Sequence, residues 1–232
     1  MFSTDIHAVM IDLDGTLVDT MGDFEAALNL CLADIDLPKV DKQVVNIAVG
    51  KGSEHLIRTV LRHQLALPEV KASGMVCDNT TVEHLFEPAF ARYQYHYEKV
   101  NGQFADVYPG VLTGLQQLQA RGLKMACLTN KPTAFAKALL ADKGLSGFFS
   151  HVYGGDAFPR KKPDPMPLLE TCKALGTQPG HTLMLGDSQN DAQAARAAGC
   201  PVVLVTYGYN HGEPIQSVEC DGFVESIAQL QW

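Results

Sequence analysis

The sequence lacks any apolar run long enough to cross a membrane, and its first residues lack the basic segment and long apolar stretch of a secretory signal peptide. Its 6 cysteines include no Cys-x-x-Cys pair and no spacing typical of a zinc site. We therefore expect a cytoplasmic protein without membrane contact, in which the cysteines are reduced thiols.

Positive charge is also scarce in this chain. It has 18 Lys and Arg residues against 26 Asp and Glu, which gives a formal net charge of -8 at pH 7. No basic stripe with interleaved aromatic residues occurs, which argues against nucleic acid as a partner. A small phosphorylated metabolite needs only a local positive site and stays compatible with this charge. With 232 residues, of which 46% are hydrophobic, we expect a globular monomer or homodimer.

The most informative stretch lies near the amino terminus. The apolar run Ala8–Ile11 is followed by Asp12, Asp14 and Gly15, which is typical of a strand buried on both faces. Because side chains alternate along a strand, the two carboxylates would project to the same side. Their proximity costs free energy unless a proton or a cation joins them, and Mg²⁺ prefers such oxygen ligands. The alternative is a surface turn with two solvated aspartates.

The rest of the chain divides into two patterns. Residues 20–99 show helical periodicity and no convincing strand, which indicates a small all-helical domain inserted after the first strand. After residue 108, short apolar runs alternate with helical segments of roughly 10–15 residues, as in a parallel sheet with right-handed crossovers. We predict an α/β fold with a doubly wound, Rossmann-like parallel sheet. Residues 1–18 and 100–232 would form the core, and 19–99 the helical cap.

Polar residues follow several of the predicted strands. Thr129 and Asn130 end one apolar run, and Asp187 ends another. The carboxyl ends of parallel strands share one edge of a sheet, so these side chains and the aspartates after the first strand would meet in one crevice. Lys162, on a loop between strands, would add a positive charge. A carboxylate nucleophile, a metal site and donors for phosphate oxygens together indicate phosphoryl transfer.

Each of these residues also has a plainer interpretation. Lys162 alone could be a solvated surface lysine, and Thr129 an ordinary strand-end hydroxyl. Asp191 fits a helix capping box with Ser188, so we expect it to be mainly structural, with an indirect contribution to the metal site as the functional alternative.

One hypothesis concerns substrate specificity. Gly50-Lys51-Gly52 lies in a predicted loop of the helical insertion and could face the site, where Lys51 or Arg58 would meet the carboxylate of a small phosphorylated acid. A solvated cap surface is the alternative.

Four segments together resemble, in order and spacing, the motifs of the haloacid dehalogenase superfamily: Asp12-Leu-Asp14-Gly-Thr16, Thr129-Asn130, Lys162-Pro163 and Gly186-Asp187-Ser188-x-x-Asp191. The resemblance covers the whole chain, including a helical cap inserted after the first motif. Further segments are most similar to bacterial phosphoglycolate phosphatases: Tyr108-Pro-Gly110, Thr129-Asn-Lys-Pro132, Lys162-Pro-Asp-Pro165 and Thr206-Tyr-Gly-Tyr-Asn210.

The resemblance implies an Mg²⁺-dependent phosphomonoester hydrolase, with 2-phosphoglycolate as its substrate. Asp12 would attack phosphorus and become an aspartyl phosphate, while Asp14 would protonate the leaving oxygen and later deprotonate the attacking water. Mg²⁺ would bind the Asp12 carboxylate, the main-chain carbonyl of Asp14, and Asp187.

The resemblance also assigns the groups that would hold the phosphoryl group. Thr129 and the backbone amide of Asn130 would bind its oxygens, and Lys162 would offset its charge during catalysis. The alternatives are a cap-bearing phosphatase of sugar phosphates or pyrophosphate, a hexose-phosphate mutase and, more distantly, a phosphorylation-dependent signalling module.

Overall fold

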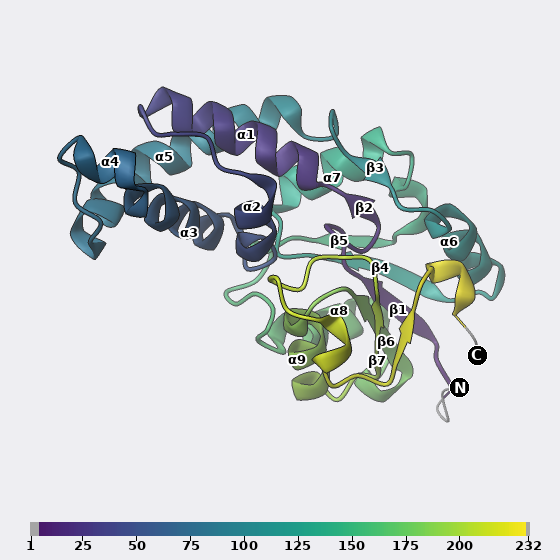
Figure 1. Cartoon of the computed structure of the whole chain (residues 1–232). Helices are drawn as coiled ribbons and strands as arrows, with labels where there is room; N and C mark the ends of the chain where they lie inside the picture. Colours follow the sequence, from purple (N-terminus) through teal and green to yellow (C-terminus); the bar gives the residue numbers. More distant parts are fainter. Residues whose placement is uncertain (1–4, 231–232) are drawn as a thin grey trace.

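The computed structural model describes residues 5–230, so the predicted core segments 1–18 and 100–232 extend past it at residues 1–4 and 231–232. Its main sheet is parallel, with the strand order β5-β4-β1-β6-β7-β8 (Figure 1). The strands are β1 (Ala8–Ile11), β4 (Lys124–Leu128), β5 (His151–Tyr153), β6 (Thr182–Gly186), β7 (Val202–Val205) and β8 (Gly222–Val224). β1 lies between β4 and β6, so the residues after these three strands are neighbours.

Helices cover both faces of this sheet, which confirms the predicted doubly wound α/β fold. One face carries α6 (Val111–Ala120) and α7 (Thr133–Asp142), and the other carries α8 (Met166–Leu175) and α9 (Gln189–Ala198). Because side chains alternate along β1, Val9 and Ile11 lie in the hydrophobic core on the side of α6 and α7. Ala8 and Met10 lie in the core on the side of α8 and α9. Since both faces of the strand are buried, its sequence is apolar throughout.

A helical insertion lies between β2 (Val18–Asp19) and β3 (Asp106–Val107), which pair in a small antiparallel sheet. Its helices are α1 (Met21–Asp34), α2 (Lys42–Ala48), α3 (Ser53–Ala66), α4 (Pro68–Ala72) and α5 (Asn79–Val100). They enclose a hydrophobic core of their own and lie beyond the carboxyl ends of the parallel strands (Figure 1). The predicted all-helical insertion is confirmed, while its limits as a cap domain, 19–99, stay a prediction.

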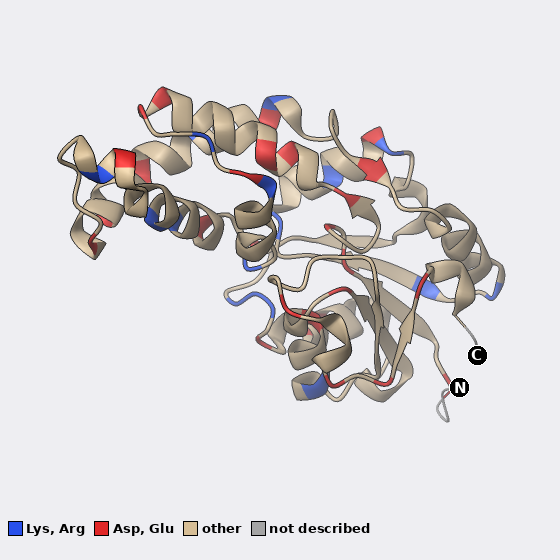
Figure 2. Cartoon of the chain, in the orientation of Figure 1, with Lys and Arg blue, Asp and Glu red and all other residues tan. Residues whose placement is uncertain are grey.

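The remaining elements are short 3₁₀ helices: η1 (Ser146–Phe148), η2 (Pro179–His181), η3 (Ile215–Ser217) and η4 (Ile227–Gln229). No helix in the described part of the chain combines the length and the apolar character needed to cross a membrane. All 6 cysteines are free thiols. Charges of both signs are spread over the molecule, and the basic loop 160–162 lies where the insertion meets the sheet (Figure 2).

A buried carboxylate in α1 binds the segment through which the chain leaves the insertion. Asp23, in the first turn of α1, is fully buried. Its Oδ2 accepts a hydrogen bond from the Gly102 amide at 2.6 Å and its Oδ1 one from the Phe104 amide at 2.7 Å. The segment that leaves α5 is thereby held against the start of α1, so the two ends of the insertion are joined to each other.

Replacing this carboxylate should destabilise the protein. Asp23→Ala leaves two amides without their acceptor, so we expect the free energy of unfolding to fall by about 2–3 kcal/mol. Chemical denaturation of the variant and of the wild type measures the difference. Glu25→Ala, on the same helix, is the matched control and should change stability by less than about 0.5 kcal/mol. Equal effects of the two substitutions would contradict the role given to Asp23.

Candidate active site

The structure brings all the predicted site residues to one edge of the sheet. They are Asp12 and Asp14 after β1, Thr129 and Asn130 after β4, Asp187 after β6, and Lys162 on the loop between β5 and α8. All of them except Lys162 line one cavity between the sheet and the insertion. Lys162 is 3% exposed and lies against Asp12. Residues far apart in the sequence therefore share one site, as parallel strand ends predict.

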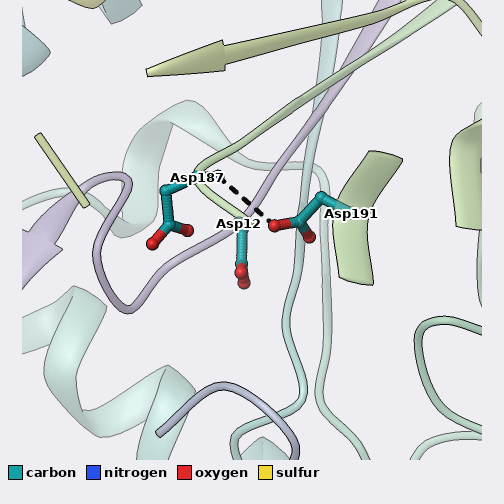
Figure 3. Close-up of side chains that lie close together, drawn as sticks. All are labelled: Asp12, Asp187 and Asp191. Atoms are coloured by element: carbon teal, nitrogen blue, oxygen red, sulfur yellow. Dashed lines mark hydrogen bonds between the residues drawn. The ribbon is translucent and has the colours of Figure 1, made fainter. Parts of the chain in front are cut away.

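An acidic cluster forms the floor of this site. Asp12, Asp187 and Asp191 each offer a carboxylate oxygen, and these oxygens lie within 4.8 Å of one another (Figure 3). The Lys162 ammonium lies 3.1 Å from Asp12 and 2.7 Å from Asp191. When all three carboxylates are ionised, the one ammonium leaves an excess of two negative charges, which a divalent cation would balance. A set of oxygen donors suits a hard cation such as Mg²⁺.

The backbone around Asp187 explains why glycines surround the site. Oδ1 of Asp187 accepts a hydrogen bond from the Thr16 hydroxyl at 2.8 Å, and Oδ2 accepts one from the Tyr209 amide at 2.6 Å. A Cβ atom at Gly15, where φ is +81°, would lie 2.2 Å from Oδ2. A Cβ atom at Gly208 would lie 2.2 Å from the Asp187 Cβ atom. Only glycine lets both backbone segments approach this carboxylate so closely.

Burial and the neighbouring charges both shift the pKa values of the site residues. Burial raises the pKa of Asp12 to about 7 despite the nearby Lys162, with Asp191 and Asp14 adding to the rise. Burial, with the charges of Asp191 and Asp12, also raises the pKa of Asp187 well above its usual range. Burial alone would lower the pKa of Lys162, but the carboxylates of Asp12 and Asp191 raise it above its usual value. The ammonium therefore stays charged at neutral pH.

Asp191 combines two roles. The capping box predicted at the start of α9 is confirmed, because the Asp191 carboxylate accepts from the Ser188 hydroxyl at 2.7 Å and from the Ser188 amide at 3.2 Å. The other oxygen of Asp191 accepts from Lys162 at 2.7 Å. The helix cap thus orients the lysine that lies beside Asp12. This second contact joins residues 29 positions apart, and the local capping pattern could not reveal it.

Asp14 is not part of the acidic cluster, and its carboxylate contacts a residue to which the sequence assigned no role. Oδ1 of Asp14 accepts from the Thr20 hydroxyl at 2.9 Å and from the Lys131 ammonium at 2.8 Å. The Lys131 side chain is only 2% exposed. Its place directly after Thr129 and Asn130 is the one sequence signal that could have identified it.

The cavity has a charged wall and an aromatic wall. Its space is about 40 Å³, enough for a few water molecules. The core supplies the acids, Thr129 and Asn130. The aromatic wall comprises Phe24, Tyr93 and Tyr97 from the insertion, and Phe135 and Tyr209 from the core. The site is therefore suited to a small ligand with one strongly anionic end.

The predicted loop of the insertion does reach the cavity. Gly50 and Gly52 line it, and the Gly50 carbonyl accepts hydrogen bonds from the side-chain amides of Asn130 at 3.1 Å and Asn190 at 3.2 Å. Lys51, by contrast, lines a separate depression beside Lys161 and Lys162.

Arg58 is engaged elsewhere. Its guanidinium lies 2.9 Å from Glu83 and stacks over the Phe86 ring. The structure therefore places neither Lys51 nor Arg58 on the wall of the cavity.

Comparison with known proteins finds a matching family model and similar relatives. Residues 6–199 match the family model of the haloacid dehalogenase-like hydrolases. The phosphoglycolate phosphatase of Thiobacillus denitrificans is 40% identical over 228 residues, which cover 98% of this chain and 95% of that protein. The phosphoglycolate phosphatase of Nitrosospira multiformis is 41% identical over 226 residues, which cover 97% of this chain and 94% of the relative.

A solved structure is similar over its whole length. The crystal structure of a protein from Haemophilus somnus 129pt, described as a predicted phosphoglycolate phosphatase, superposes with a TM-score of 0.88 at 31% sequence identity. The match covers 98% of this chain and 97% of that one. Both the sheet and the helical insertion are thus shared with that protein.

A divalent cation should stabilise the protein, and more so at higher pH. Because folding raises the pKa values of Asp12 and Asp187, the cation-free protein holds protons that the unfolded chain loses. The contribution of these protonated groups to the free energy of unfolding is fully present below about pH 4, and it is lost as the pH rises through about 7. In a chelator, we expect the Tm to fall between pH 5 and pH 8, and added Mg²⁺ to restore it at pH 8. Thermal unfolding at each pH, with and without Mg²⁺, measures both effects.

Asp187→Asn provides the control for this prediction. It removes one of the crowded charges, so the variant in chelator should be more stable than the wild type at pH 8 and should gain less from Mg²⁺. An equal gain in variant and wild type would show that the cation binds at another place.

Proposed function

The chain belongs to the haloacid dehalogenase-like hydrolases, and from this premise we propose that it is an Mg²⁺-dependent phosphomonoesterase that hydrolyses 2-phosphoglycolate to glycolate and phosphate. The observation that carries the proposal is the pair Asp12 and Asp14 at the wall of one small cavity, with Lys162 and Asp187 beside Asp12. This pair would provide a nucleophile for phosphorus and a proton donor for the leaving oxygen.

The reaction would proceed in two steps. In the first, a carboxylate oxygen of Asp12 attacks phosphorus, and the bond from phosphorus to the leaving oxygen breaks as Asp14 gives that oxygen a proton. In the second, water attacks the aspartyl phosphate and gives a proton to Asp14, and the bond between phosphorus and Asp12 breaks. Glycolate leaves after the first step and inorganic phosphate after the second, so both aspartates return to their starting state.

The remaining site residues would hold the transferred group. The Thr129 hydroxyl and the Asn130 amide would bind phosphoryl oxygens, and Lys162 would offset their charge. Mg²⁺ would be held by Asp12, Asp187 and the main-chain carbonyl of Asp14. When bound, the cation would supply electrostatic stabilisation of the phosphoryl oxygens.

Two observations support the choice of substrate. Relatives about 40% identical over nearly the whole chain are named phosphoglycolate phosphatases. The cavity is small and has an aromatic wall, which suits a two-carbon acid better than a sugar with several hydroxyl groups.

Phosphate release from a panel of substrates tests the proposal. We expect the wild type with Mg²⁺ to prefer 2-phosphoglycolate over sugar phosphates, pyrophosphate and a nucleoside monophosphate. A chelator should abolish the activity. Asp12→Asn should lower kcat by roughly 10⁴-fold or more, because it removes the nucleophile. Release that does not depend on Asp12 would refute the mechanism, and preference for another ester would refute the substrate.

Two controls separate chemistry from folding. Asp106→Asn changes an exposed carboxylate on β3 and should leave the activity unchanged. Asp12→Asn removes a buried charge, so its Tm in chelator at pH 8 should be at least that of the wild type. If the wild type released no phosphate from any substrate, phosphate transfer between sugar phosphates with a bisphosphate activator would be the next assay.

A further inference from the structure

Lys131 lines the cavity with a buried ammonium group, and the proposed phosphoryl transfer does not use it. The side chain of Lys131 is 2% exposed. Its Nζ atom donates to Asp14 at 2.8 Å and to the Tyr97 hydroxyl. It also lies 4.8 Å from the centre of the Phe24 ring and 4.6 Å from that of the Tyr97 ring. An ammonium has three N–H donors, and these two hydrogen bonds occupy two of them.

Lys131 is the one positively charged residue among the described residues that line the cavity. Lys162 lies behind Asp12, Lys51 lines another depression, and Arg58 pairs with Glu83. The wall around Lys131 is otherwise mostly apolar and aromatic, formed by Phe24, Leu56, Tyr93, Pro132 and Phe135. A second anionic group of a ligand, bound in this half of the cavity, would find its counter-charge at Lys131.

The position of Lys131 also limits the distance between the phosphoryl group and the second anionic group of the ligand. Asp14 is the proposed proton donor to the leaving oxygen, and Lys131 Nζ is 2.8 Å from its carboxylate. A group attached one or two carbon atoms beyond the leaving oxygen would therefore come within reach of Nζ. A sugar phosphate would instead place several neutral hydroxyl groups against aromatic rings that offer few hydrogen bonds.

We propose that Lys131 is the specificity residue that binds the carboxylate of a short phosphorylated acid, through its third N–H donor. The inference rests on the proposed function and deepens it, since it names the residue that separates 2-phosphoglycolate from phosphate esters of the same size that lack a second anionic group. A desolvated ammonium facing a carboxylate is strongly favourable, whereas the same ammonium facing a methyl group gains nothing.

The experiment compares 2-phosphoglycolate with ethyl phosphate, in which a methyl group replaces the carboxylate. Lys131→Met should lower kcat/KM for 2-phosphoglycolate by roughly 100-fold or more, and that for ethyl phosphate by less than about 5-fold. The preference for the acid that the wild type shows should therefore be largely lost in Lys131→Met. Lys137→Met, which changes an exposed lysine on α7, is the matched control and should alter neither value.

Two results would overturn the inference. An equal loss with both substrates would show that Lys131 serves only to position Asp14, and no loss with either would show that it does not meet the substrate. If Lys131→Met fails to fold, Lys131→Gln replaces it, because the amide keeps an N–H donor for Asp14 but lacks the charge.

A binding measurement separates this inference from the proposed function. Calorimetric titration of Asp12→Asn and of Asp12→Asn/Lys131→Met with both esters, in Mg²⁺, needs no turnover. A preference for the acid that disappears with Lys131 would support the inference even if the wild type hydrolysed neither ester. The absence of any preference for the acid in Asp12→Asn would refute it, whatever the wild type hydrolyses.

Discussion

The crowding of carboxylates at the ends of β1 and β6 is the constraint around which the rest of the structure is arranged. Asp12, Asp187 and Asp191 bring three acids together in a buried space, with the single ammonium of Lys162 between two of them. Such a cluster is costly unless hydrogen bonds and cations offset the charge. The surrounding architecture supplies these partners, from the helix cap at α9 to the Tyr209 amide on Asp187.

The site is formed jointly by the sheet and the helical insertion. The core contributes charge and hydrogen-bond donors, while the insertion contributes most of the aromatic wall and the Gly50 loop. Lys131 joins the two, because it follows β4 in the core and donates to both Asp14 and Tyr97 of α5. A ligand in the cavity would contact both parts at once, so recognition by the insertion and chemistry in the core are coupled through a shared space.

Local sequence patterns predicted the elements well, because their causes are local. The apolar run before Asp12, the capping pattern from Ser188 to Asp191 and the helical periodicity of residues 20–99 each reflect a regular backbone with a fixed side-chain repeat. The motifs brought together by the resemblance likewise lie at the ends of neighbouring strands. Lys131 was not singled out, since its charge acquires a role only next to Asp14, which is 117 positions away.

The sequence by itself determined the parallel α/β sheet, the helical insertion and the placing of acids after β1 and β6, because strand and helix periodicities and strand ends can be read residue by residue. Tertiary structure alone decided which charges meet. It paired Arg58 with Glu83 on the surface, set Lys162 between Asp12 and Asp191, and buried Lys131 in the cavity. The energy of a charge depends on its burial and its partners, and both are properties of the assembled chain.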